Sequence, residues 1–240
     1  MDLNKEKQHL HAISRIHRYT DGFNGRLTKY RALKIRELYT QRGSLLDLGA
    51  GEGELSALLA EQFDTIAITE ASSEYLDQAK KNLSGYPVTF LHALIEEVAL
   101  DEQFDLVLAS GILEHVHDPR AILDRIKRWL KPDGILIVIV PNANSLHRQV
   151  GVYMGMIKDC HELGELDHKV GHRRYYGLID LQNEVASAGY HISSSGGILL
   201  KPFPNSLMNG LTEAYCDALY QLGNDHPSLC AEIYCACRIA

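Results

Sequence analysis

The sequence predicts an α/β fold: a doubly wound, seven-stranded, mostly parallel sheet with helices on both faces. Short apolar runs alternate with segments of helical periodicity, which is typical of right-handed parallel βαβ units. The first apolar run opens into a glycine-rich turn, as strands of such sheets do where they approach a ligand. The last two runs, near 190–195 and 230–239, should pair as a hairpin, which makes the seventh strand antiparallel.

The composition fits one globular domain over residues 1–240, with 45% hydrophobic and 23% charged residues. The net charge of −7 disfavours a nucleic-acid partner, because phosphate backbones are bound by clustered Lys and Arg. Five cysteines without a C-x-x-C pair indicate a reducing compartment. The N-terminal segment has no apolar signal core, and no apolar run approaches the ~18 residues that would cross a bilayer. We therefore expect a cytoplasmic protein without a membrane span.

Residues 1–42 are expected to form a helical lid. Two helices are predicted within residues 4–41, separated by a turn at Thr20–Gly25 (TDGFNG). Helices that precede the first strand cannot join the sheet, and we expect these two to cover the ligand cleft. Gly43 then ends the second helix before a strand at 44–48.

Residues 43–140 should form the ligand-binding core. The helix before its last strand has clear end signals, with Asp118 as N-cap and Pro119 at the first helical position. Residues 131–134 (KPDG) are predicted to close that helix with a tight turn. The strands that follow the first are expected at about 64–69, 87–91, 105–109 and 135–140.

Residues 141–176 interrupt the alternation with a long connection at the carboxyl edge of the sheet. Such connections are usually functional or form a lid, so we expect a helical insert on the substrate side. Residues 177–240 should complete the sheet. Their elements are expected to be a helix at 177–188, a strand at 190–195, a helix at 205–222 and a strand at 230–239.

The glycine-rich turn, Leu45–Gly53 (LLDLGAGEG), narrows the class of ligand. Its alternate glycines let the backbone approach a ligand closely, because glycine has no Cβ. The spacing differs from the dinucleotide pattern G-x-G-x-x-G, and no Lys-Ser or Lys-Thr follows as in a Walker loop. Glu70 lies 21 residues after Gly49, the offset at which a carboxylate reaches ribose hydroxyls. A nucleoside with a free diol and no phosphate fits both features.

Four ordered motifs over residues 45–145 resemble those of class I S-adenosylmethionine-dependent methyltransferases. They read DLGAGEG, ITEAS, FDLVLASGILEHVHDP and LKPDGILIVIVPNANS. The resemblance implies S-adenosylmethionine as methyl donor and S-adenosylhomocysteine (SAH) as product. More loosely, the insert is similar to methyltransferases of ubiquinone biosynthesis and natural-product tailoring. This implies in-line methyl transfer to an oxygen, or alternatively a nitrogen, of a small-molecule acceptor.

The resemblance also implies which residues hold the cofactor. Asp47 and the backbone of residues 49–53 should face its amino-acid end, where the next helix presents unpaired N–H groups to a carboxylate. Glu70 should accept hydrogen bonds from the ribose. Many relatives carry Asp near positions 93–94 for the adenine amino group, and this chain does not. The expected cofactor residues are Asp47, Gly49, Ala50, Gly51, Gly53, Glu70, Ala71, Ala93, Leu94, Ile95, Ser110 and Gly111.

His115 is the predicted catalytic residue. A hydroxyl or protonated amine acceptor benefits from a general base of near-neutral pKa, and histidine is the usual choice. His115 lies in GILEHVHDP, after the fourth strand and on the side where acceptors enter in the family it resembles. A packed or capping histidine is the alternative for this position. Glu114 is expected to take part in local hydrogen bonding.

Two segments of the insert, 141–151 and 167–176, mix His, Arg and aromatic residues. Arg can form two parallel hydrogen bonds with a carboxylate or phosphate group. These segments would therefore suit an acidic or phenolic acceptor. The alternative is a helix-turn with solvated basic residues. The predicted acceptor-binding residues are His147, Arg148, His172, Arg173 and Tyr176.

Other functions were left open by the sequence. His161, His168 and His172 are close in sequence, but without Cys or a second carboxylate pair we predict no metal. A methyltransferase of peptides or nucleic acids is disfavoured by the charge and by the lack of an N/D-P-P-[YF] motif. A non-catalytic S-adenosylmethionine-binding module is disfavoured by the intact glycines and Glu70. The oligomeric state is not indicated.

Overall fold

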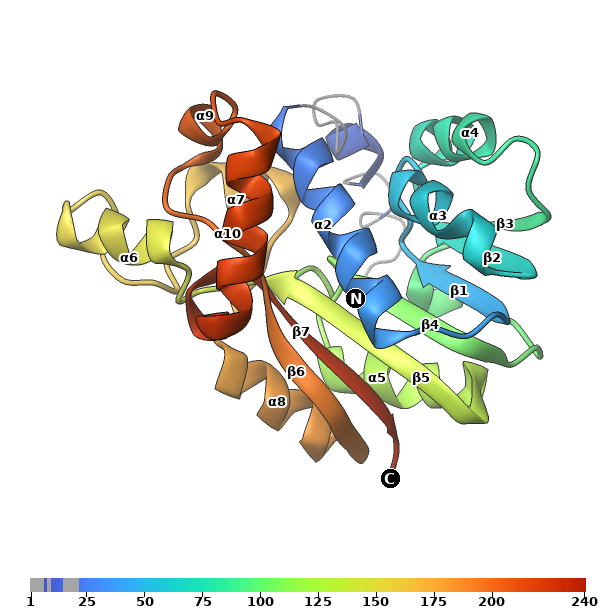
Figure 1. The fold of residues 1–240 in the computed structure, drawn as a ribbon. Helices are drawn as coiled ribbons and strands as arrows, with labels where there is room; N and C mark the ends of the chain where they lie inside the picture. The colour runs from blue at the N-terminus through green and yellow to red at the C-terminus, as the bar shows by residue number, and fades with distance from the viewer. Residues whose placement is uncertain (1–6, 8–9, 15–21) are drawn as a thin grey trace.

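The computed structural model describes residues 7, 10–14 and 22–240, and a single twisted sheet lies at its centre (Figure 1). The strand order is β3-β2-β1-β4-β5-β7-β6, and β7 runs antiparallel to β5 and β6. Strands β1 to β5 are parallel. The predicted fold class is thereby confirmed. The strands are β1 (Ser44–Leu48), β2 (Thr65–Glu70), β3 (Val88–His92), β4 (Phe104–Ser110), β5 (Leu130–Pro141), β6 (Tyr190–Leu200) and β7 (Cys230–Ile239).

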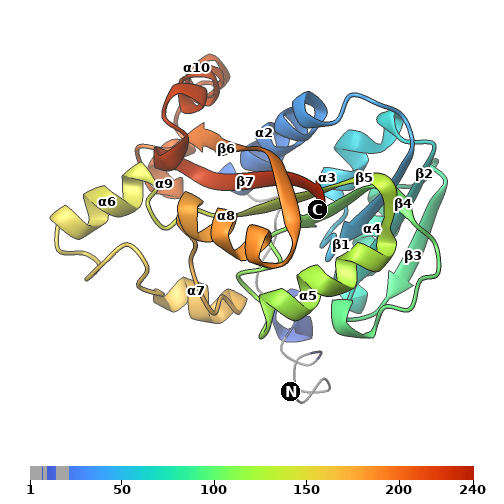
Figure 2. The same cartoon turned by 90° about the horizontal axis from the view of Figure 1, so that it is seen from below.

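Helices cover both faces of the sheet, because the central strands bury apolar side chains on both sides. One face packs against α2 (Phe23–Leu38), α3 (Glu54–Leu59), α4 (Ser73–Asn82) and α10 (Glu213–Asp225). The other packs against α5 (Pro119–Ile126) and α8 (Leu178–Ser187). Figures 1 and 2 show these two layers from different sides. Short 3-10 turns lie at Ala60–Gln62, Ile95–Glu97, Lys127–Trp129 and Pro227–Leu229.

Several local predictions are confirmed. The carboxylate of Asp118 accepts a hydrogen bond of 3.0 Å from the backbone N–H of Ala121, and Pro119 is the first residue of α5. Strands β1 and β7 have the expected bounds. These signals depend on local chemistry, which is why the sequence locates them well.

The tight turn predicted at Lys131–Gly134 is wrong. The 3-10 turn Lys127–Trp129 already ends the helical segment, and residues 131–134 belong to β5, as an irregularity between the pairs Phe104–Leu130 and Leu106–Ile135. A Cβ on Gly134 would lie 2.9 Å from the carbonyl oxygen of Phe104 on β4. The glycine therefore serves close strand packing next to the register shift between β4 and β5.

Two C-terminal boundaries also differ from the prediction. Strand β6 extends to Leu200, since its pairing with β7 continues to Cys230. The single helix expected at 205–222 is two helices, α9 (Asn205–Met208) and α10. The hydroxyl of Thr212 accepts a hydrogen bond from the backbone N–H of Tyr215, and this cap starts α10 afresh.

The N-terminal region contributes to the core and also to the cavities described below. Residues 10–14 are helical, and the rest of the first predicted helix lies mostly outside the described residues. Helix α2 begins at Phe23, so the turn predicted at 20–25 ends earlier than expected. Phe23, Tyr30 and Ile35 of α2 are fully buried. This helix is thus part of the core as well as a wall of the cavity described below.

The long connection after β5 contains α6 (Leu146–Tyr153) and α7 (Glu165–Val170). Both helices lie to one side of the sheet (Figure 2). This agrees with the expected helical insert. Within the described part of the chain, no helix combines the length and the apolar character needed to traverse a bilayer.

Candidate active site

Two adjoining cavities open at the carboxyl ends of β1 and β4, where the strand order of the sheet reverses. This is the usual ligand site of open α/β sheets. The larger cavity has a volume of about 280 Å³ and the smaller one about 110 Å³. They share the walls formed by Gly49, Gly51, Gly111 and His115. One extended ligand can therefore occupy both.

The loop after β1 is held in a shape that requires glycine. Gly49 and Gly51 have φ angles of 64° and 57°, in the left-handed region that side chains disfavour. The N–H of Gly49 donates to the Thr69 hydroxyl at 3.0 Å, and the N–H of Gly51 donates to the Glu70 carboxylate at 2.9 Å. A Cβ on Gly49 would lie 2.6 Å from Cδ1 of Ile112. The loop is fixed by β2 before any ligand binds.

Gly53 has a different structural reason to be glycine. Its φ angle is 73°, and a Cβ there would lie 2.9 Å from Cβ of Ala79 on α4. It is not among the residues that line the two cavities. The close packing of α3 on α4 therefore accounts for this glycine, although the sequence grouped it with the cofactor loop.

Glu70 ends β2 with its carboxylate at the smaller cavity. One oxygen accepts from the N–H of Gly51, and the other accepts from the N–H of Ser72 at 2.7 Å. Burial raises the pKa of this carboxyl group, while the backbone hydrogen bonds act to lower it. Each oxygen keeps a lone pair for a further donor. The predicted adenine-side residues line the same cavity: Ala71, Ala93, Leu94 and Ile95.

Asp47 lies at the end of β1 and lines the larger cavity. Its side chain is buried and accepts a hydrogen bond of 2.6 Å from the Ser56 hydroxyl. Burial raises its pKa to about 6, the Ser56 hydrogen bond lowers it, and the nearby charge of Glu70 raises it. Among the described residues, no positively charged side chain forms an ion pair with the buried carboxylate of Asp47.

Ser110 ends β4, Gly111 follows it, and both line the larger cavity, as expected. The Ser110 hydroxyl is buried and has no hydrogen-bond partner within the described structure. One carboxylate oxygen of Glu114, Oε2, is buried in the same way. Buried polar atoms are rarely left unpaired, so both atoms indicate a place where a polar ligand binds.

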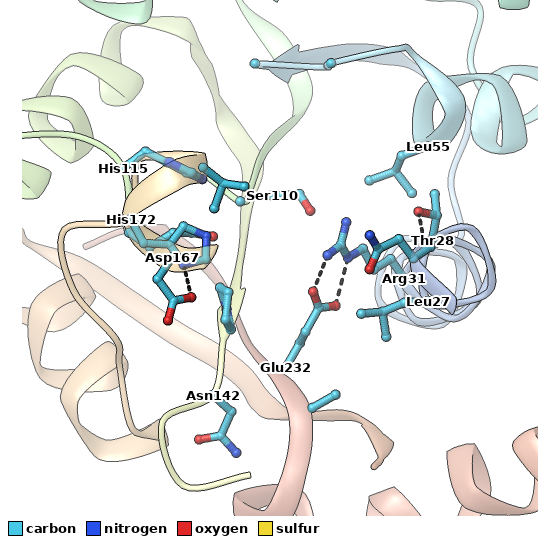
Figure 3. A pocket seen from close by; sticks show the side chains of 18 of the residues that line it. Leu27, Thr28, Arg31, Leu55, Ser110, His115, Asn142, Asp167, His172 and Glu232 are labelled. Atoms are coloured by element: carbon cyan, nitrogen blue, oxygen red, sulfur yellow. Dashed lines mark hydrogen bonds and ion pairs between the residues drawn. The ribbon is translucent and has the colours of Figure 1, made fainter. Parts of the chain in front are cut away.

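Acidic and imidazole groups gather on one wall of the larger cavity (Figure 3). Side-chain atoms of Glu114, His115 and His172 lie within 4.8 Å of one another. The two imidazole rings meet edge to face, with centroids 4.7 Å apart. Nδ1 of His172 is 3.1 Å from the carboxylate of Asp167, which also accepts from the Tyr175 hydroxyl at 2.7 Å. The insert and the loop after β4 together build this cluster.

Burial raises the pKa of Glu114 to about 7, although the charges of His172 and Arg31 oppose the rise. Asp167 behaves in the opposite way. Burial acts to raise its pKa, but hydrogen bonds from His172, Tyr175 and the Gly164 N–H lower it to about 2. One wall of the cavity therefore holds a firmly ionised carboxylate and a second whose charge responds to near-neutral pH.

Basic side chains also line the larger cavity. Arg148 donates to the carbonyls of Cys160 and Glu162, and its guanidinium lies 3.9 Å from the centre of the Tyr175 ring. Burial lowers the pKa of Lys201 to about 8 despite the charge of Glu232. Burial also lowers the pKa of His147 to about 3, so this imidazole is neutral.

An ion pair lies at the larger cavity. Arg31 on α2 meets Glu232 on β7 through two hydrogen bonds, one of them 2.8 Å long, as Figure 3 shows. The Glu232 side chain is only 4% exposed, so its charge depends on this partner. The contact joins two elements far apart in sequence at the cavity wall.

The structure does not place every predicted acceptor residue at the cavity. His147, Arg148 and His172 line it, whereas Arg173 and Tyr176 do not. The exposed Arg173 donates from Nε to the His115 carbonyl at 2.6 Å, which holds the loop after β4 in place. Tyr176 is buried in the core, and its neighbour Tyr175 lines the cavity instead. Alternation along an extended segment decides which of the two faces inward.

The sequence also missed Asp167 and Lys201 as cavity residues. Asp167 was one polar residue among many in the insert, and Lys201 directly follows the observed end of β6, beyond the strand expected at 190–195. His161 and His168, considered as metal ligands with His172, are both exposed and do not join it at the cavity. The grouping that the fold produces is Glu114, His115 and His172.

Comparisons with known proteins agree with this geometry. A family model described as a methyltransferase domain matches residues 17–195. The tRNA 5-carboxymethoxyuridine methyltransferase of Escherichia coli (strain K12) is 31% identical over 118 residues, covering 47% of this chain and 45% of that protein. A ubiquinone biosynthesis O-methyltransferase of Actinobacillus pleuropneumoniae serotype 7 is 31% identical over 121 residues, covering 47% and 50%. The alignments thus span about half the length of these relatives.

A solved structure has the same fold over nearly the whole chain. The N-methyltransferase NodS of Bradyrhizobium japonicum WM9, in complex with SAH, superimposes with a TM-score of 0.62 at 11% identity, covering 100% of this chain and 99% of NodS. At that identity the likeness concerns the fold alone. The family match, in contrast, extends over well over half of the residues. This chain therefore belongs to the methyltransferase domain family.

Proposed function

We propose that the protein transfers a methyl group from S-adenosylmethionine to an oxygen, or alternatively a nitrogen, of a small-molecule acceptor. One observation carries the proposal. A nucleoside-sized cavity, bordered by Glu70 and the glycine loop, continues into a larger cavity lined by acidic, imidazole and cationic groups. A donor can lie across the shared wall at Gly111, with its reactive end toward an acceptor in the larger space.

The residues present fit this cofactor. The Ser110 hydroxyl lacks a partner within the described structure, and a Cβ on Gly49, which lines both cavities, would clash with Ile112. Glu70 would bind the ribose diol, and Asp47 would receive the ammonium group of the amino-acid end. When bound, S-adenosylmethionine supplies an electrophilic methyl group. The chain's own residues then hold the acceptor in line at about 3 Å and exclude water.

The cations in the larger cavity favour an acidic acceptor. Arg148 donates hydrogen bonds to the carbonyl groups of Cys160 and Glu162, which leave its charge unneutralised. The Lys201 ammonium makes no ion pair with a carboxylate of the described residues, and lies 5.8 Å from the centre of the Phe23 ring. A carboxylate or phosphate on a small molecule would pair with either group. The proton of a hydroxyl acceptor would pass to an imidazole, for which the sequence indicates His115.

A macromolecular acceptor is the second candidate. The first of the two relatives above acts on a uridine of tRNA, as its name states. The net charge of −7 argues against a polyanionic partner here. Radiolabelled methyl transfer separates these classes when bulk tRNA and a tRNA-free metabolite extract are offered in parallel.

Ligand-dependent stability tests the first step. Thermal unfolding is measured with S-adenosylmethionine, SAH and NAD. A ligand that binds only the folded state stabilises it by about 2.7 kcal/mol at 100 times its Kd. We expect this from the two adenosyl ligands alone, and stabilisation by NAD alone would contradict the proposal. Transfer of labelled methyl groups to a compound of the extract then identifies the acceptor.

A further inference from the structure

Two imidazoles face the space where the acceptor would lie, and the geometry distinguishes them. We propose that Nε2 of His172 takes the proton of a hydroxyl acceptor, and that Asp167 is the positioning residue of this base. The proposal rests on the proposed function, which requires an acceptor in the larger cavity. It moves the acid–base role from His115, which the sequence motif favours, to a residue of the insert.

The tautomer of His172 follows from its partner. Nδ1 lies 3.1 Å from Oδ1 of Asp167. The low pKa of Asp167 means that this carboxylate is ionised and can only accept a hydrogen bond. Nδ1 of His172 must therefore carry the hydrogen. In the neutral ring, Nε2 then has the lone pair that a base needs.

Asp167 is itself held firmly. Its Oδ2 accepts from the Gly164 N–H at 2.8 Å, and its Oδ1 accepts from the Tyr175 hydroxyl at 2.7 Å. Its backbone carbonyl accepts from the N–H of His172 at 2.8 Å. The Tyr175 ring meets the His172 ring edge to face, with centroids 5.8 Å apart. The pair is therefore aligned before an acceptor arrives, as efficient proton transfer requires.

The surroundings favour the charged product of the step. Asp167 and Tyr175 face His172 from the insert, and Glu114 and His115 face it from the loop after β4. Arg31 and Glu232 act on this cluster indirectly, through Glu114. The carboxylates of Asp167 and Glu114 can both stabilise an imidazolium, since opposite charges attract strongly in a buried site. The Oε2 atom of Glu114 is buried and has no hydrogen-bond partner within the described structure, so it is available to stabilise this imidazolium.

The step balances in atoms and charge. A lone pair of the acceptor oxygen forms the O–CH3 bond while the S–CH3 bond breaks and leaves its electron pair on sulfur. The hydroxyl proton passes to Nε2 of His172, and the positive charge moves from sulfur to the imidazolium. Release of that proton to solvent restores the base. A phenol that also carries an anionic group fits best, because Arg148 and Lys201 line the same cavity.

The tautomer can be measured without turnover. Long-range proton–nitrogen NMR spectra of histidine-labelled protein, saturated with SAH, should show His172 with hydrogen on Nδ1. In Asp167→Asn the hydrogen should no longer be confined to Nδ1, because the ionised partner that fixes the tautomer is gone. Glu165→Gln is the matched control, since this exposed residue of α7 pairs only with Lys169 in the described structure. Hydrogen on Nε2 of His172 in the wild type, or a tautomer that does not change in Asp167→Asn, would overturn the proposal.

Turnover supplies the second arm, with 4-hydroxybenzoate and the acceptor found in the extract as substrates. We expect His172→Gln to lower kcat at least a hundredfold with little change in KM or in SAH affinity. The acid limb of the pH profile should move to lower pH in Asp167→Asn and stay in place in Glu165→Gln. Activity that chelators abolish and a divalent cation restores would contradict the proposal, since Nε2 of His172 would then bind metal.

The two proposals fail in different ways. If SAH neither binds nor stabilises the protein, the proposed function is wrong. If SAH binds and methyl transfer proceeds, but His172→Gln keeps full kcat, only the assignment of the base is wrong. Loss of kcat in His115→Ala together with full activity in His172→Gln would return the role to His115.

Discussion

Replacing Asp47 by asparagine should stabilise the ligand-free protein at pH 8 and weaken its binding of SAH. The Asp47 carboxyl group is 2% exposed and has one hydrogen-bond donor, the hydroxyl of Ser56 at 2.6 Å. Burial is the main cause that raises its pKa from 3.8 to about 6. Asparagine keeps an oxygen for Ser56 and never ionises. It also cannot attract the ammonium group of the cofactor.

The direction of the stability change with pH follows from the linkage between proton binding and folding. The folded-state pKa of Asp47 lies above the unfolded value, so between them the folded state binds more protons. The stability contributed by this group is complete below about pH 4 and is lost as the pH rises through about 6. A shift of about two pKa units corresponds to roughly 3 kcal/mol. Asparagine avoids this loss, so its unfolding temperature relative to wild type should rise by roughly 6 to 12 °C between pH 4 and pH 8.

The assay compares thermal unfolding of wild type, Asp47→Asn and Asp77→Asn at pH 4, 6 and 8. Asp77 is an exposed residue of α4 that pairs with Lys80, so it controls for loss of a surface charge. Calorimetric titration with SAH should show at least a tenfold weaker Kd for Asp47→Asn alone. An unfolding temperature difference that does not change with pH, together with unchanged SAH affinity, would refute the reasoning.

Three further outcomes follow from the geometry. Gly49→Ala should weaken SAH binding more than tenfold, because the φ of Gly49 is 64° and the new Cβ would meet Ile112. Gly155→Ala is the control, since Gly155 has a similar φ of 69° but a Cβ there would point into open space. This control should lose only about 1 to 2 kcal/mol of stability. Equal SAH affinity in both variants would contradict this. Arg31→Met should destabilise the protein by about 3 kcal/mol in urea unfolding, since it leaves the Glu232 carboxylate buried without its partner. Adding Glu232→Gln should recover part of that loss, and a purely additive double variant would show that the pair contributes nothing.

Where local chemistry decides the structure, the sequence was sufficient. The bounds of β1 and the start of α5 follow from apolar runs and from the Asp118–Pro119 cap. Tertiary context decided the rest. Gly134 looks like a turn residue, yet it serves close contact with β4 inside a long strand. Such pairing partners are distant in sequence, so no local signal reports them.

The site divides in the same way. The smaller cavity is lined mainly by the segments that follow β1, β2, β3 and β4. Glu70 lines it, as its spacing from Gly49 predicts. The larger cavity depends on how the insert folds back over the loop after β4. Sequence spacing could not decide between Tyr175 and Tyr176, or show that Asp167 lies beside His172. Folding of the insert sets both outcomes.

A crystal structure of the SAH complex tests the central claim most directly. We predict that the ribose hydroxyls of SAH donate to the carboxylate of Glu70, that its adenine lies beside Ala93 and Leu94, and that its sulfur points past Gly111 toward His172. SAH bound outside these two cavities, or a Glu70 carboxylate that makes no contact with the ribose, would contradict the assignment of the cofactor site and of everything built on it.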